Sequence, residues 1–218
     1  RTFGAPAPLT LGVRPLFSQH QNMLQAIVFC GLLTLLTALE WTIVDCITPF
    51  LYFPLLGIAW LSFAVSAIVA LVRWYQRRGE RFKAARPALL HLATLAILLF
   101  VPFTNIELWL DFHMKKAERE AVVQEVQSGK LLPNVPHNHR LISLGTRKRL
   151  SAGGNEVMVD TEQGKTYVFF FTYRGILDNY SGFLFVPLGG SPESFGPPNE
   201  RAVQLIKFSD QWYFTSRH

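Results

Sequence analysis

Four carboxylates are the residues best suited to ion chemistry. Glu40 and Asp45 lie near the outer end of one apolar run. Glu107 and Asp111 lie near the outer end of another, four residues apart and hence on one helical face. Carboxylates that converge at one membrane surface can bind a cation or relay a proton. The same acids are also typical of the boundary between the membrane and the outer water, where a carboxylate is easily solvated. The sequence leaves both interpretations open. Glu40 falls within the first expected span, so it needs a partner if it lies in the hydrocarbon.

His137 and His139 lie on one side of an extended segment, and two imidazoles are half of a metal site. No cysteine lies nearby and the closest acids are Glu125 and Glu156, so a solvated linker is the simpler interpretation. The chain also has no G-x-S-x-G nucleophile motif and no phosphate-binding glycine loop. We therefore expect no metal site, no cofactor and no catalytic residue, and a protein that is not an enzyme.

Two charges interrupt the aromatic stretch FFFTYRGILDNYSGFLFVP, residues 169–187. Loops held by a rigid sheet are common places for recognition. Arg174, Asp178, Asn179 and Tyr180 are therefore candidates for binding a partner. In the alternative interpretation Arg174 pairs with Asp178 and closes a turn, with Asp178 or Asn179 capping backbone groups.

Three apolar segments before residue 111 must position the carboxylates. The expected spans are residues 22–44, 51–72 and 88–110, and the middle one carries no charge over about the length that a 30 Å hydrocarbon core requires. Buried helices of a soluble protein usually carry a polar stripe, and residues 51–72 show none. The sequence therefore predicts three transmembrane helices in a lipid bilayer.

The basic residues indicate the orientation of these spans. The loop of residues 73–87 holds six of the 21 Lys and Arg residues and a single acid, Glu80. Short loops rich in Lys and Arg remain in the cytoplasm. We therefore expect residues 1–21 in the cytoplasm as well, and everything after residue 110 in the periplasm of a bacterium. Since topology explains the net charge of +6, we expect no nucleic acid as a partner.

Residues 111–139 are expected to form a stalk helix, which continues the third span, and then a linker. Met114, Ala117, Ala121 and Val122 recur at helical spacing. Charged residues such as Arg119 lie opposite them. The N-terminal part of the region outside the membrane is thus helical and amphipathic.

Residues 140–218 show the alternation and turn chemistry of an antiparallel β-domain. Strands are expected over 141–144, 157–160, 166–173, 181–186, 202–208 and 211–216. The stretch 169–187 is then strand, turn and strand rather than a fourth span, because each charge inside a membrane costs roughly 2.5–3.5 kcal/mol. The fold class is three transmembrane helices plus a small α+β, antiparallel β domain outside the cytoplasm. Its aromatic residues exceed what one sheet face can bury, so either both faces are covered or one face binds something.

The pattern FFFTYRGILDNYSGFLFVP followed by LIKFSDQWYF resembles the C-terminal region of uncharacterised small bacterial inner-membrane proteins. The layout also resembles that of multi-span immunity proteins, which protect bacteria from secreted toxins. We expect an inner-membrane protein whose periplasmic domain binds a protein partner without catalysis, as an immunity protein or as an accessory subunit of a membrane complex. The alternative is transport or ion handling by Glu40, Asp45, Glu107 and Asp111.

Overall fold

The computed structural model describes residues 19–76, 81–175, 179–196 and 202–217. The chain divides into two compact units, a helical unit of residues 1–37 and 53–101 and a sheet unit of residues 38–52 and 102–218. Most of the N-terminal segment, the centre of the basic loop and Asp178 lie outside the described residues, and so do the expectations placed on them.

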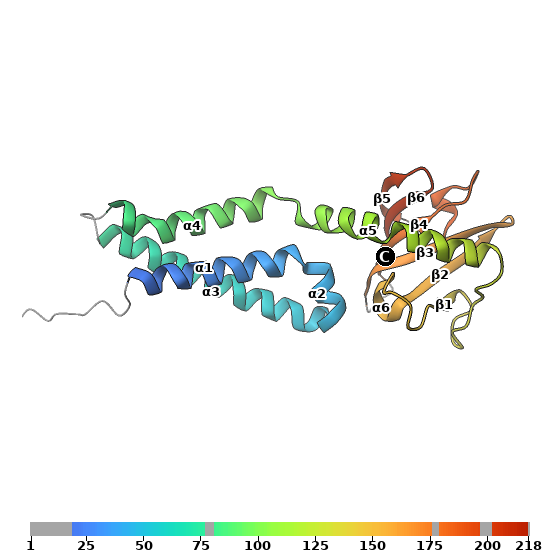
Figure 1. Ribbon diagram of the computed structural model, residues 1–218, viewed down its shortest axis with the longest axis horizontal. Helices are drawn as coiled ribbons and strands as arrows, with labels where there is room; N and C mark the ends of the chain where they lie inside the picture. Colours follow the sequence, from blue (N-terminus) through green and yellow to red (C-terminus); the bar gives the residue numbers. More distant parts are fainter. Residues whose placement is uncertain (1–18, 77–80, 176–178, 197–201, 218) are drawn as a thin grey trace, which may run out of the picture. The chain divides into compact units, whose positions relative to one another are not determined.

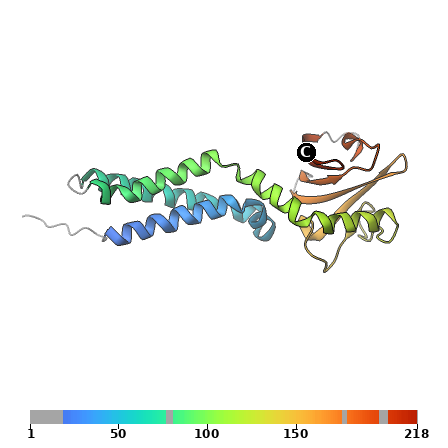
Figure 2. The ribbon, with the colours of Figure 1, turned by 45° about the horizontal axis from the view of Figure 1, so that its top comes forward.

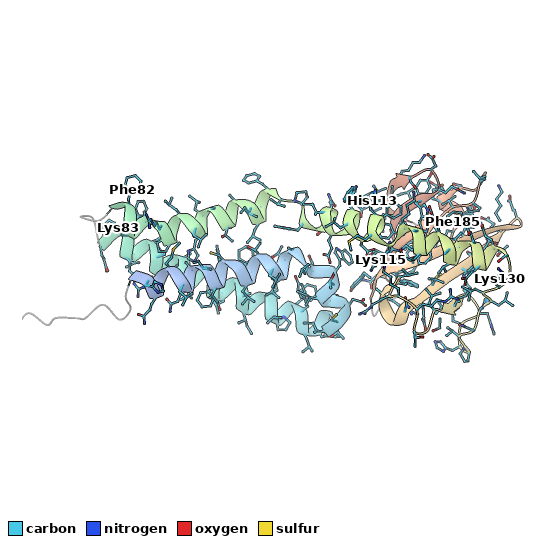
Figure 3. The ribbon with its side chains drawn as sticks, in the orientation of Figure 1. Phe82, Lys83, His113, Lys115, Lys130 and Phe185 are labelled. Atoms are coloured by element: carbon cyan, nitrogen blue, oxygen red, sulfur yellow. The ribbon has the colours of Figure 1, made fainter. Side chains whose placement is uncertain are left out.

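The helical unit is built from three long helices, α1 (Gln19–Ala38), most of α3 (Pro49–Gln76) and α4 (Arg81–Phe100). Each contains a segment long and apolar enough to cross a membrane: His20–Ala38, Phe50–Gln76 and Phe82–Phe100. Both views of the ribbon show the three helices running alongside one another (Figures 1 and 2). Phe82 and Lys83 mark the start of α4 (Figure 3). The prediction of three helices with these properties is confirmed.

The first and third spans are shorter than expected. α1 ends at Ala38, and Leu39 adopts φ −115° and ψ 29° before the separate helix α2 (Glu40–Ile47) begins. α4 ends at Phe100, and Pro102, with φ −79° and ψ 71°, precedes α5 (Phe103–Gln127). A proline has no N–H to donate to the preceding turn, so the third span does not continue as a stalk. α5 instead begins anew and belongs to the sheet unit.

The sheet unit contains six antiparallel strands in the order β1-β2-β3-β4-β6-β5. The strands are β1 (Leu141–Ser143), β2 (Glu156–Glu162), β3 (Lys165–Arg174), β4 (Tyr180–Phe185), β5 (Ala202–Ser209) and β6 (Trp212–Arg217). The short elements α6 (Ala152–Asn155) and η2 (Pro192–Ser194) lie between strands. The predicted strands and their antiparallel pairing are confirmed, including β3–turn–β4 in place of a fourth span.

Both faces of the sheet are covered. α5 crosses one face (Figure 2), where Phe112 packs against Phe183 and Trp212 with ring centres 5.2 and 5.7 Å apart. On the other face Phe195, which follows η2, stacks on Phe169 at 5.3 Å. Successive residues of β3 therefore alternate between two buried cores, which accounts for three consecutive buried phenylalanines at 169–171.

The two edges of the sheet differ. The outer edge of β1 is closed by Asn134, whose side chain accepts a hydrogen bond from Ser143 N at 2.7 Å and donates one to Ser143 O at 3.2 Å. β5 lies at the other edge, and among the described residues only β6 pairs with it. An edge strand without a neighbour presents a row of free N–H and C=O groups.

Candidate functional site

Three of the four acids meet where α2, α5 and the β1–α6 loop come together. Asp45 pairs with Arg149 at 2.5 Å and accepts a hydrogen bond from Gly153 N at 3.1 Å. Asp111 pairs with Lys115 and Arg119, both at 2.6 Å. Lys115 is visible on α5 in Figure 3.

Glu107 has a different kind of partner, the N-terminus of α2. It accepts hydrogen bonds from Trp41 N at 3.3 Å, from Thr42 N at 3.1 Å and from Thr42 Oγ1 at 2.8 Å. Leu39, at the N-cap position of α2, has no side chain able to cap the helix. Glu107 thus performs the capping from a distant helix, in the position where the α2 dipole favours a negative charge.

Glu40 is the fourth acid, and it lies apart from the ion pairs and hydrogen bonds of the other three. It is half-buried at the first residue of α2, outside the apolar segment of α1. Burial, and the nearby charge of Glu107, raise the pKa of Glu40 above its ordinary value. The break after Ala38 therefore removes this carboxylate from the first span, where the sequence had left its position open.

We call the six charged residues of this region the α2–α5 charge cluster: Asp45, Glu107, Asp111, Lys115, Arg119 and Arg149. Three acids face three bases, so the formal charges cancel. They line a pocket of about 650 Å³ whose remaining wall is largely apolar, with Ile106, Leu110 and Met114 from α5. Within the described ranges, no three His, Cys, Asp or Glu side chains come close enough to hold a metal ion. The observed contacts join α2 to α5 and the β1–α6 loop.

Arg119 was expected on the solvated face of its helix, and this expectation was wrong. Its side chain is 1% exposed and lies over the ring of Phe183, 4.7 Å from the ring centre. It donates to Leu150 O at 3.0 Å as well as to Asp111. The spacing of Phe112, Arg119 and Val126, seven residues apart, was the signal that places this arginine on the buried face.

The residues expected to bind a partner lie around the β3–β4 turn. Arg174 forms an ion pair with Glu156 of β2 at 2.7 Å and lies 5.1 Å from the ring centre of Phe171, while its expected partner Asp178 is outside the described residues. Asn179 O accepts a hydrogen bond from Gly175 N at 2.7 Å, which closes the turn. Tyr180 is buried among the rings of Phe169 and Phe171.

Asn179 and Tyr180 line a second pocket, of about 350 Å³, which we call the β5 pocket. Gln204 and Ile206 of β5 form another part of its wall, and Trp41 of α2 also contributes. Trp41 Nε1 and Asn179 Oδ1 are buried, and neither atom has a hydrogen-bond partner within the described parts of the chain. Trp41 and Asn179, which the sequence could not bring together, thus line one pocket beside β5.

The exposed apolar side chains of β5 complete this surface. Val203, Leu205 and Ile206 are 63%, 39% and 38% exposed. Register shifts between Ala202 and Gln204 and between Lys207 and Ser209 interrupt the pairing of β5 with β6. The regular part of the strand available to a neighbour is therefore centred on Gln204–Lys207.

Comparisons of the chain with protein-family models, with curated proteins and with solved structures give no match.

Proposed function

We propose that this chain is a multi-pass protein of the bacterial inner membrane whose sheet unit lies in the periplasm and binds a protein partner without catalysis. In this proposal an extended segment of the partner adds to the sheet along β5. The observation that carries the proposal is the contrast between the two edges: Asn134 occupies the edge of β1, whereas β5 carries exposed apolar side chains and pairs with β6 alone among the described strands.

Membrane insertion is supported by the surfaces of α1, α3 and α4. Large apolar side chains along them are exposed, for example Ile58 at 63% and Leu99 at 69%, and at most 28% of the apolar window of any one span is buried. Exposed apolar area of this extent needs an apolar solvent. The orientation rests on the basic loop between α3 and α4.

Partner binding at β5 is β-strand addition, in which main-chain hydrogen bonds give affinity and pockets for alternate side chains give specificity. The β5 pocket lies on the face of the sheet to which Gln204 and Ile206 project. A bound segment brings peptide N–H and C=O groups, which suit Asn179 Oδ1 and Trp41 Nε1 once a side-chain shift uncovers these two buried atoms. Lys207 and the two register shifts limit the open stretch, as is usual for an edge that must not aggregate.

An immunity protein and an accessory subunit of a membrane complex both need such a surface. A gene for a secreted toxin next to this gene favours the immunity role. Ion handling has less support, because Asp45, Glu107 and Asp111 are each engaged by a base or by backbone N–H groups.

The test is site-specific photo-crosslinking in cells that produce the full-length protein. A photoreactive amino acid at Leu205 should give one discrete adduct, identified by mass spectrometry, and the same amino acid at Met114, an exposed residue of α5, should not give it. The double variant Val203→Lys/Gln204→Lys should abolish the adduct, since charged edge residues oppose strand addition. An adduct with a second copy of this chain, or none at all, contradicts the proposal.

The orientation has its own test. Alkaline phosphatase fused after residue 218 should be active, because this enzyme requires an oxidising compartment to form its disulfides. An inactive fusion together with an active cytoplasmic reporter at the same position contradicts a periplasmic sheet unit.

A further inference from the structure

A cavity inside the helical unit has a composition unlike the two pockets of the sheet unit. It measures about 270 Å³ and lies between α3 and α4. Phe63, Leu71 and Trp74 line it from α3, and Ala88, His91 and Leu92 line it from α4. Apart from the indole of Trp74, the imidazole of His91 is the one polar side chain that the described residues contribute to its wall. We call it the His91 cavity.

His91 is 4% exposed, and its two ring nitrogens have different surroundings. Nδ1 lies 2.7 Å from Pro87 O, one helical turn earlier. A carbonyl oxygen can only accept, so Nδ1 carries the hydrogen, and Nε2 of the neutral ring presents a lone pair. Nε2 is buried and has no hydrogen-bond partner within the described parts of the chain.

A buried polar atom without a partner is uncommon and calls for an explanation. In a membrane span such a residue marks a functional site more often than a structural one. The ring of His91 is held against Phe63, with ring centres 5.0 Å apart. The arrangement therefore fixes the ring by its Nδ1 side and by its face and leaves the Nε2 acceptor unused.

The cavity is reached from the outer surface of the helices. Leu71, Trp74 and Leu92, which line it, are 51%, 45% and 63% exposed. On a protein inserted in a bilayer this surface faces lipid, so a ligand would enter from the hydrocarbon phase. Because the wall is apolar and His91 Nε2 has no donor, the chemistry suits a lipophilic molecule that carries a hydroxyl group.

We propose that the His91 cavity binds the head group of a membrane quinol, with a quinol hydroxyl donating to His91 Nε2. The flat ring suits a cavity bordered by Phe63 and Trp74. The volume of about 270 Å³ suits a single small ring, with the isoprenoid tail left among the lipid-facing leucines. Since Nε2 has no exposed surface, the hydroxyl reaches it after a side-chain shift of the kind that binding commonly brings.

The lone pair at Nε2 distinguishes the two redox forms of the ligand. A quinol presents O–H donors, whereas the oxidised quinone presents only carbonyl acceptors and finds no donor at Nε2 of the neutral ring. The site should therefore prefer quinol to quinone. The proposal concerns binding and includes no electron transfer. It depends on insertion in the membrane and is independent of partner binding at β5.

The test uses the purified full-length protein in lipid nanodiscs and three probes: a short-chain ubiquinol kept reduced under anaerobic conditions, the corresponding quinone, and farnesol. Saturable binding of the quinol, at least about tenfold tighter than that of the quinone, is the expected result; tenfold is the effect of about one well-placed hydrogen bond. Equal affinities for quinol and quinone overturn the assigned donor and acceptor roles. Farnesol binding as tightly as the quinol overturns the assignment of a ring-bearing ligand.

Two variants connect the binding to this cavity. His91→Phe keeps an aromatic ring but removes the acceptor, and should lower quinol affinity at least about tenfold while leaving the weak quinone binding unchanged. Ala88→Phe fills the cavity without changing His91, and should remove binding of both forms. Since the second variant keeps the histidine, it tests the site even if the first one fails to fold.

His113→Phe is the matched control. His113 makes the same contact one helical turn back, with Nδ1 2.8 Å from Trp109 O, but it is exposed on α5 in the sheet unit. Its replacement should leave quinol affinity unchanged. If His91→Phe and Ala88→Phe both fold and both bind the quinol as the wild type does, the His91 cavity is not the site.

Discussion

The carboxylate of Glu107 accepts two hydrogen bonds from Thr42, a residue 65 positions earlier in the chain, one from its backbone N and one from its Oγ1. A residue that the sequence offers as a cation ligand thus caps a short helix that has no cap of its own. α2 comprises eight residues, fewer than an isolated helix needs to be stable in water. Its stability must therefore come from contacts such as this one.

The variant Glu107→Ala tests the cap. Removal of the carboxylate leaves the first N–H groups of α2 without their partner, and loss of a capping side chain costs about 1 kcal/mol. We expect faster hydrogen exchange at the amides of α2 and a modest fall in thermal stability of the sheet unit. Glu120→Ala is the control, because Glu120 is exposed on the same helix α5 and forms one ion pair within the described residues, with Lys116 at 3.7 Å. Equal exchange rates in the two variants contradict a capping role.

The pH dependence of stability should reveal the cost of ionising Glu40 in the folded protein. Burial and the charge of Glu107 raise the pKa of Glu40 in the folded protein. Its ionised form is therefore disfavoured in the folded state, and stability falls as pH rises from the unfolded pKa through the folded one. Glu40→Gln should raise the melting temperature at pH 7.5, and the gain should disappear as the pH is lowered below the ordinary pKa of a glutamate. A gain that is the same at every pH, or a loss at pH 7.5, shows that the charge of Glu40 is not the cause.

Arg119 should be among the most sensitive positions of α5. Replacement by alanine leaves Asp111 with Lys115 alone and leaves Leu150 O without the Arg119 donors in a buried site, and a buried polar group without a partner costs about 1–3 kcal/mol. Arg119→Met retains most of the volume over Phe183 and should cost less than Arg119→Ala. Chemical denaturation of the protein in detergent measures both variants.

A matched control separates burial from charge in that experiment. Arg147 also pairs with an acid of α5, Glu125, at 2.7 Å, but its side chain is 45% exposed. Arg147→Ala should cost less than about 1 kcal/mol, as exposed pairs do. If Arg119→Ala and Arg147→Ala destabilise the protein equally, the burial of Arg119 contributes nothing to its role.

Local chemistry explains which parts of this fold the sequence could predict. The hairpin between β2 and β3 could be predicted because Gly164, with φ +74°, provides the left-handed turn between two alternating runs. The break at Pro102 lies inside the span expected over residues 88–110, and the helix after it could not be placed from the sequence, because only packing of α5 on the sheet decides where the new helix belongs. The cap of α2 by Glu107 joins residues that no local pattern relates.

The candidate sites also combine features that the local sequence predicts with features that depend on residues distant in the chain. Asn179 and Tyr180 could be proposed from the turn that contains them, but the neighbouring wall of their pocket comes from β5 and α2, elements remote in the chain. Asn134, which closes the β1 edge, carries no sequence signal beyond its place in a linker. The aromatic residues of the β-domain left two alternatives, a sheet covered on both faces or one face that binds something, and the structure was needed to show the first, with α5 and Phe195 as the covers.

Gly182 is a position in the centre of the sheet where an added side chain has no room. It lies opposite Phe171 in the β3–β4 register, and a Cβ added there would lie 2.0 Å from Phe170 O and 2.8 Å from Phe169 Cζ. The ring of Phe169 can shift, but the backbone of the central strand cannot move without breaking its pairing. Gly182→Ala should therefore destabilise the sheet unit by an amount at the upper end of the 1–3 kcal/mol, roughly, that overpacking costs.

The control for this substitution is Gly31→Ala in α1, where an added Cβ meets nothing within 4 Å. Alanine is a better helix former than glycine, so this variant should be neutral or slightly more stable. The two substitutions add the same methyl group. A difference in thermal stability between the two variants is therefore caused by the close approach of β3 and β4 at Gly182. Near-ultraviolet circular dichroism on heating, dominated by the aromatic rings packed on the sheet, gives the comparison. An unchanged transition for Gly182→Ala means that β4 can move away from Phe170 O at no cost, which contradicts the tight pairing inferred for the centre of the sheet.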